Sequence, residues 1–206
     1  NGAYAVKVDG ASFDVRGVLA EMKGEVEVGP DAVAGETADI VLVARVGKLH
    51  GYNERVLNDA AVSFVLRDDV IRKIAVAGRL GGGPVALDLT EEISQASVSA
   101  SADNGGALLD YLDIYGRVGG GRLQVDGARP SPTGPLAGTM ALTGFAILDE
   151  PAIGEVVSRA KPKDGEKVEA DKMNVEQMSA VFRYEGDRIT IDDAFLHQEL
   201  SPGVVA

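Results

Sequence analysis

Apolar side chains recur at every second position in one segment after another, and this period of two constrains the fold more than any other feature of the chain. In one such segment Ile40, Leu42, Ala44 and Val46 share one face of an extended strand. Strands with one apolar and one polar face are typical of antiparallel sheets that have one side in water. The same alternation occurs over residues 4–9, 62–66, 85–89, 98–102, 122–126, 138–148 and 178–196.

The composition fits a sheet with an aliphatic core and excludes several classes of function. Of the 206 residues, 45% are hydrophobic but only 5% are aromatic, and 26 are glycines, a mixture that favours strands and turns over long helices. The net charge of −12 repels phosphate groups, which argues against binding along a nucleic-acid backbone. The absence of cysteine excludes disulfides, thiolate catalysis and cysteine-ligated zinc.

Three short segments have helical spacing instead, and we expect them to lie against the sheet. Each begins with a residue that suits the start of a helix, namely Asp14, Asp103 or Asn104, and Pro151. The three helices are predicted near residues 14–22, 104–115 and 151–160. The apolar stripe of the second helix consists of Leu108, Leu109, Leu112 and Tyr115.

The connections between the alternating segments predict hairpins and a faint internal repeat. The dipeptides Asp68-Asp69 and Gly186-Asp187 suit hairpin tips, and the segments around them, 57–73 and 175–191, align without gaps. We therefore expect two loosely similar strand–helix–meander units. Their bounds are 1–95 and 96–206.

The fold class that these patterns predict is mainly β with a few short helices, a β-rich α+β protein. Its strands form a long twisted antiparallel sheet, shaped as a groove or a half-open barrel. No stretch approaches the length of a membrane-spanning helix, and no signal peptide is visible. Because the sequence begins and ends within its pattern, we expect it to be a segment cut from a longer protein.

Glycine clusters at residues 105–106 and 119–121 raise the possibility of a phosphate-binding loop, but their spacing does not support one. A dinucleotide fingerprint requires G-x-G-x-x-G between a strand and a helix, whereas the second cluster follows the predicted helix. The structural interpretation is simpler. The first cluster relaxes the entry into the helix, and the second supplies positive-φ positions at the exit into the next strand.

No residue pattern in the sequence nominates a catalytic or metal site. His50 and His197 lie far apart and lack the spacing of metal ligands, and the acidic pairs Asp68-Asp69 and Asp192-Asp193 lack a calcium-loop pattern. We therefore expect no catalytic residues, no metal and no cofactor, and the chain is not predicted to be an enzyme. An enzymatic alternative, a carbohydrate hydrolase on a β scaffold, requires two carboxylates that converge in a cleft.

The apolar strand faces are the strongest functional signal. Leaving such a face in water costs about 25 cal/mol per Å², so it requires cover from helices, a second sheet or an apolar ligand. Three short helices do not cover every strand, which favours an open groove for a hydrocarbon guest; a closed sandwich that covers itself is the alternative. The groove candidates are Val62, Phe64, Leu66, Leu87, Leu142, Phe182 and Ile189.

Three stretches of the second half resemble the C-terminal region of AsmA-like proteins, bacterial envelope proteins related in architecture to the TamB-like group. They are SADNGGALLDYLDIYGRVGGGRLQVDG, GPLAGTMALTGFAILDEPAIGEVVSRA and MSAVFRYEGDRITIDDAFL. The resemblance covers residues 97–206, and the first half is similar only in style. It implies an inner-membrane-anchored protein with a β-rich periplasmic body that resembles bridge-type lipid-transfer proteins, and it offers no catalytic residues.

The expected function follows from this resemblance together with the one-sided strands. We expect a non-enzymatic periplasmic segment that contributes to phospholipid transport or to outer-membrane assembly and maintenance, with its anchor outside this sequence. Expected partners are phospholipid acyl chains, neighbouring repeats of the same chain and envelope proteins, but not nucleic acid. The alternative is a self-covered β module that acts as a scaffold for protein partners or for outer-membrane protein assembly.

Overall fold

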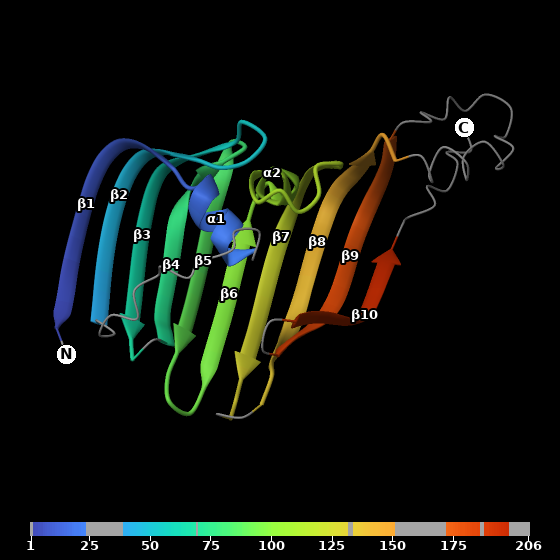
Figure 1. The fold of residues 1–206 in the computed structure, drawn as a ribbon. Helices are drawn as coiled ribbons and strands as arrows, with labels where there is room; N and C mark the ends of the chain where they lie inside the picture. Colours follow the sequence, from blue (N-terminus) through green and yellow to red (C-terminus); the bar gives the residue numbers. More distant parts are fainter. Residues whose placement is uncertain are drawn as a thin grey trace, which may run out of the picture.

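The computed structural model describes residues 2–23, 39–68, 70–131, 134–150, 172–185 and 188–197. These residues form one ten-stranded sheet and two short helices (Figure 1). The strands are β1 Ala3–Asp14, β2 Asp39–His50, β3 Val56–Arg67, β4 Val70–Leu80, β5 Gly83–Glu91, β6 Ala96–Ala102, β7 Val118–Arg129, β8 Leu136–Leu148, β9 Lys172–Glu185 and β10 Arg188–His197. The helices are α1 Arg16–Met22 and α2 Gly105–Tyr111.

The strands follow one another across the sheet in chain order, so nearly every neighbouring pair is antiparallel, as the alternation predicted. The exception is the first pair. β1 and β2 are parallel, with Ala3 in register with Asp39 and Asp14 in register with His50. Because the two strands run in the same direction, the connection between them, which begins with α1, is a crossover instead of a hairpin.

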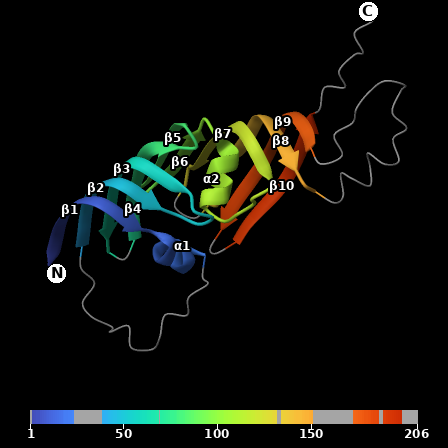
Figure 2. The same cartoon turned by 90° about the horizontal axis from the view of Figure 1, so that it is seen from above.

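The sheet is curved, and both helices lie on its inner, concave side (Figure 2). One end of this side forms the core, where α2 packs on the strands through Ala107 and Tyr111. Leu80 and Leu142 are the most deeply buried large side chains there, each with 1% of its surface exposed. The strands are therefore covered at one end by helices, and the prediction of a mainly β, twisted sheet with few helices is confirmed.

Helix α2 begins where the sequence predicted but ends earlier. Asn104 is its N-cap and accepts a hydrogen bond from the backbone N–H of Ala107 at 3.0 Å. The helix ends at Tyr111, so Tyr115 lies beyond it, 40% exposed, and is not part of the helical stripe. Tyr111 is the buried aromatic residue instead, with 5% exposure, and burial raises its pKa to about 12.

The other two predicted helices have different outcomes. Helix α1 covers residues 16–22, within the predicted range, but its N-cap is Val15, which provides no side-chain hydrogen bond. Asp14, the expected cap, accepts a hydrogen bond from the backbone N–H of Arg16 at 3.0 Å. The helix predicted at 151–160 lies outside the described residues.

The predicted hairpins are confirmed by the strand pairing. Arg67 is in register with Val70, and Glu185 with Arg188, so both aligned repeat segments form antiparallel hairpins at the expected positions. The expected boundary between residues 95 and 96 lies in the connection between β5 and β6. These two strands pair along their length, so the sheet is continuous across that boundary.

Candidate functional site

The concave side of the sheet, called the inner face here, carries two rows of side chains that cross all ten strands without a polar residue. The residues of a row are register partners on neighbouring strands and therefore point to the same face. The first row consists of Val8, Ala44, Val62, Val76, Leu87, Ala100, Val125, Met140, Ala180 and Ala194. The second consists of Val6, Leu42, Phe64, Ile74, Leu89, Val98, Gly127, Gly138, Phe182 and Ile191.

The opposite, outer face has a different chemistry along an equivalent row. The residues there are small, polar or charged at most positions, so the two faces of the sheet differ in polarity over its whole width. This outer row consists of Lys7, Val43, Ser63, Ala75, Asp88, Ser99, Asp126, Thr139, Val181 and Asp193. The contrast identifies the inner face as the candidate functional surface.

Cover over the inner face decreases away from the end where α2 packs. Leu123 and Leu142, in the row beneath the helix, are 8% and 1% exposed. At the two edges of the second row, Val6 is 41% exposed and Ile191 is 48% exposed. Among the described residues no second sheet packs on this face, so part of a continuous apolar surface remains accessible.

The seven groove candidates all lie on the inner face, but in different surroundings. Five of them are half-buried or exposed, and two are buried. The half-buried candidates are Val62, Phe64, Leu66 and Leu87. Ile189 is 67% exposed at the β10 edge, where it is in register with Tyr184.

The two buried candidates do not contribute equally to the open surface. Leu142 is sealed beneath α2, where its Cδ1 atom lies 2.5 Å from the position that a Cβ would occupy on Gly105. It is therefore part of the core and not of an accessible surface. Phe182 is 9% exposed and packs over Gly127, in the second row itself.

Sequence reasoning missed most members of the two rows because it considered the strands one at a time. Phe64 is in register with Leu42 and Ile74, and the same row continues through Leu89 and Val98. Each of them stands at an alternating apolar position, so the signal was present in the sequence. Only the register of the strands, however, brings these positions into one line.

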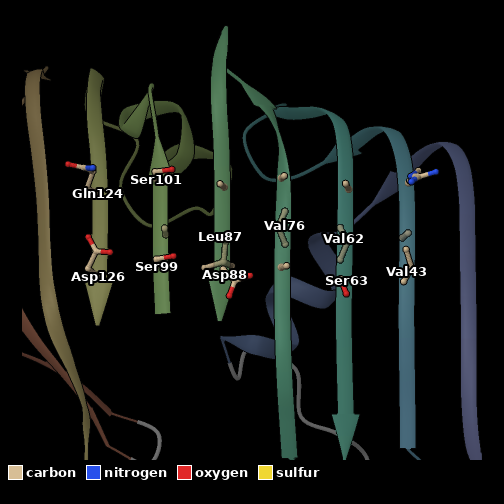
Figure 3. A pocket seen from close by; sticks show the side chains of 17 residues that line it. Val43, Val62, Ser63, Val76, Leu87, Asp88, Ser99, Ser101, Gln124 and Asp126 are labelled. Atoms are coloured by element: carbon tan, nitrogen blue, oxygen red, sulfur yellow. The ribbon is translucent and has the colours of Figure 1, made fainter. Parts of the chain in front are cut away.

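The outer face contains a shallow hollow of about 520 Å³, which the groove prediction did not anticipate (Figure 3). It forms where the side chains of Ala61, Ala75, Ala77 and Ala86 leave space between larger neighbours. Polar side chains of β5, β6 and β7 line one part of it. The hollow is open to solvent, and its ionisable lining residues are Arg45, Asp88 and Asp126. The two aspartates lie on β5 and β7, each in register with Ser99 on the strand between them.

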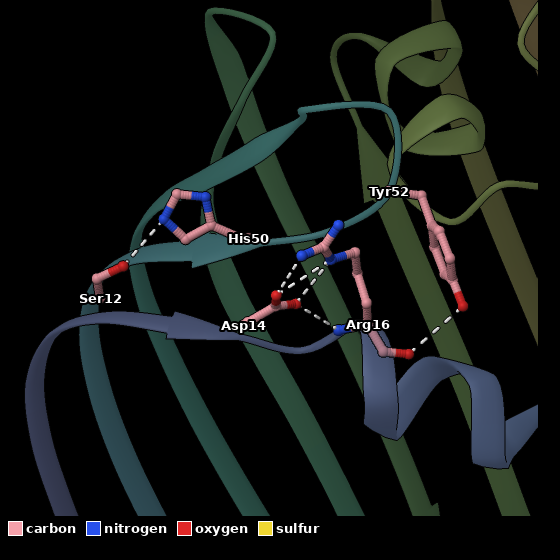
Figure 4. A network of polar contacts seen from close by, with 5 residues as sticks. All are labelled: Ser12, Asp14, Arg16, His50 and Tyr52. Carbon is pink, nitrogen blue, oxygen red and sulfur yellow. Dashed lines mark hydrogen bonds and ion pairs between the residues drawn. The ribbon is translucent and has the colours of Figure 1, made fainter.

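A serine–histidine contact at the end of β1 is the other arrangement with possible chemistry (Figure 4). The hydroxyl oxygen of Ser12 and Nε2 of His50 are 2.9 Å apart, as in an activated nucleophile. A triad also needs an acid that orients the histidine. The nearby Asp14 carboxylate instead accepts hydrogen bonds from Arg16, whose Nε is 2.9 Å from Oδ1. We interpret the contact as a link between β1 and β2.

The Asp14–Arg16 pair gives a prediction for titration. Hydrogen bonds from the Arg16 side chain and backbone lower the pKa of Asp14 to about 2. Because the folded-state pKa is depressed, this stabilisation is present above the ordinary pKa of 3.8 and is lost as the pH falls toward 2. We expect Arg16→Ala to return the Asp14 pKa toward 3.8, as measured by NMR of the carboxyl carbon. An unchanged pKa in that variant would contradict this assignment.

The described residues contain neither a group of side chains that could bind a metal ion nor a membrane-spanning helix. These residues hold no group of three or more histidine, cysteine or acidic side chains placed to bind a metal ion. His50 and His197 are on different strands, and His197 Nε2 lies 3.5 Å from a carboxylate oxygen of Glu176. Within the described ranges no helix is long and apolar enough to cross a membrane.

Comparisons with known proteins add no assignment. No protein-family model, no curated protein sequence and no solved structure matches this chain.

Proposed function

We propose that this chain is a non-enzymatic segment of a bacterial envelope protein and that its inner face holds the hydrocarbon chains of lipids. The observation that carries the proposal is the pair of apolar rows that cross all ten strands without a polar side chain. A lipid tail placed on these rows would remove apolar surface from water, at about 25 cal/mol for each Å² buried. The lipid headgroup would stay in solvent.

The length of the rows suits passage along the sheet better than one fixed binding site. Nine steps between ten strands, at about 4.8 Å each, give roughly 43 Å. A single leaflet of a bilayer is about 15 Å of hydrocarbon, half of the 30 Å core. Each row is therefore longer than one acyl chain, and it contains no polar side chain that would fix a chain at one position.

The resemblance to AsmA-like proteins suggests where such a surface would operate. We place the segment in the periplasm, as part of an inner-membrane-anchored protein that contributes to phospholipid transport or outer-membrane maintenance. Neighbouring repeats of the same chain and other envelope proteins are the proposed partners. A second candidate function, a scaffold for protein partners, is supported by the exposed edge strand β1.

Fluorescence quenching by a brominated lipid tests the proposal, because it shows which face of the sheet the lipid contacts. The chain has no cysteine, so one cysteine can be introduced and labelled with a fluorophore at Ile191 on the inner face or at Val43 on the outer face. These residues are 48% and 44% exposed, so they are matched in access to solvent. We expect phosphatidylcholine with brominated acyl chains to quench the label at position 191 and to leave the label at 43 nearly unchanged.

Two other results would contradict the lipid-binding proposal. Equal quenching at both positions would indicate nonspecific adsorption, and no quenching at either would reject lipid binding by this face. The scaffold function would survive the second result. Circular dichroism of both labelled proteins provides the control for folding.

A further inference from the structure

Strand β1 is an edge strand: β2 pairs with one of its two lateral edges, and no described strand pairs with the other. It is the first strand in the sheet order, and all twelve of its residues are exposed. It pairs with β2 from Ala3 to Asp14 without a register shift. Among the described residues, no strand binds its other side, so a row of backbone N–H and C=O groups is available for pairing.

The opposite edge is better protected. β10 contains an irregularity between Ile191 and Asp193, where its register with β9 shifts. Two adjacent aspartates also lie on this edge, of which Asp192 forms an ion pair with Arg183 of β9 at 3.2 Å. Bulges and charged side chains are features by which edge strands avoid pairing. β1 has no such irregularity, and its two central charges have opposite signs, with Lys7 Nζ 3.2 Å from Oδ2 of Asp9.

From the charge pattern of β1 we propose that a second copy of this chain pairs with it, antiparallel, about a two-fold axis at Val8. This register places Lys7 opposite Asp9 of the second copy, and Asp9 opposite its Lys7, so two ion pairs form across the interface. The two Val8 side chains meet on the axis. The inner faces of both copies then join into one apolar surface, because the axis is perpendicular to the sheet.

Neighbouring registers do not satisfy the charges. An axis at Lys7 places the two lysines opposite each other, and an axis at Asp9 does the same for the two aspartates. An axis at Val6 leaves Lys7 opposite Ala5 and Asp9 opposite Ala3. Like charges directly opposite on paired strands are destabilising, whereas opposite charges stabilise the pair. Val8 is thus the centre that the charges select.

Cysteine scanning tests the register without competing native thiols. Val6 and Val8 are 41% and 38% exposed on the same face of the same strand, which makes them a matched pair. In the proposed dimer two cysteines at position 8 lie within disulfide distance, whereas two at position 6 are about 13 Å apart, four residues along the strand. We expect mild oxidation to cross-link Val8→Cys and not Val6→Cys.

Charge variants test the interface chemistry. Lys7→Glu alone and Asp9→Lys alone place like charges opposite each other, and we expect each to weaken dimerisation about tenfold or more. An equimolar mixture of the two variants restores both cross-interface ion pairs, although neither variant regains the pair within its own strand. Sedimentation velocity of the wild-type chain, each variant and the mixture provides the measurement, with circular dichroism to confirm folding.

Three outcomes would overturn the proposal. The first is a wild-type chain that stays monomeric at all concentrations, with no cross-link at position 8. The second is a cross-link at position 6 that forms as fast as that at position 8. The third is a mixture of charge variants that associates no better than its components. The cysteine results remain decisive if a charge variant fails to fold.

Discussion

Leu142→Asp is expected to abolish stable folding. Leu142 is 1% exposed and lies in register with Leu123 and Met178, beneath the first turn of α2. Removing a buried leucine side chain alone costs about 2–5 kcal/mol. An aspartate there adds the cost of a buried charge without a partner, and the sum is a large fraction of the roughly 5–15 kcal/mol that stabilises a typical domain.

The same row of the sheet provides a control with the same chemistry. Leu196 on β10 is in register with Met178 but is 52% exposed. Leu196→Asp should change the free energy of unfolding by less than about 1 kcal/mol. Urea denaturation followed by circular dichroism measures both variants, and Leu142→Ala provides a readable intermediate if the aspartate variant does not fold. Equal midpoints for Leu142→Asp and Leu196→Asp would mean that α2 does not cover this end of the sheet.

The period of two in the sequence was enough to predict a mainly β fold and the positions of most strands. It predicted the hairpins at residues 68–69 and 186–187 because each tip separates two alternating runs of matching length. It did not predict the parallel pairing of β1 with β2, because alternation is the same in parallel and antiparallel edge strands. Direction depends on where the chain returns to the sheet, which is a property of the crossover.

The candidate surface was predictable in kind but not in extent. Phe64 and Phe182 were both recognised, and the structure places them in one row through partners on the strands between them. The sequence could not distinguish Leu142, which α2 covers, from Leu87, which stays half-buried. Cover depends on where a helix lies on the sheet, and the period of the strand carries no information about that.

The structure shows how both glycine clusters are packed, and for the first cluster this differs from the role that the sequence predicted. Positive φ angles were expected at residues 119–121; Gly120 and Gly121 have them, at +68° and +80°, but Gly119 does not, and all three lie within β7. Gly105 and Gly106 were expected to relax the helix entry. Both are buried, and they allow α2 to lie directly against neighbouring strands. A Cβ on Gly105 would meet the Leu142 side chain, and a Cβ on Gly106 would meet the backbone of Val118, so close packing explains the first cluster.

Gly106→Ala is therefore expected to be strongly destabilising, although alanine normally favours a helix. A Cβ at position 106 would lie 2.2 Å from the carbonyl oxygen of Val118 and 3.1 Å from the amide nitrogen of Gly120. Both atoms belong to the backbone of β7, which begins at Val118, so α2 would have to move away from the strand. Overpacking of this kind costs about 1–3 kcal/mol, more than the propensity gain of about 1 kcal/mol.

Helix α1 supplies the control, because Gly17 is its second residue as Gly106 is the second residue of α2. A Cβ at Gly17 would meet no atom within 4 Å, so Gly17→Ala should gain helix propensity without a clash and stabilise the chain by a few tenths to about 1 kcal/mol. Thermal unfolding should thus shift in opposite directions for the two variants. If both raised the melting temperature, α2 could not be packed against β7 at the proposed separation. Both the cover over one end of the inner face and the distinction between buried Leu142 and accessible Ile191 depend on that packing.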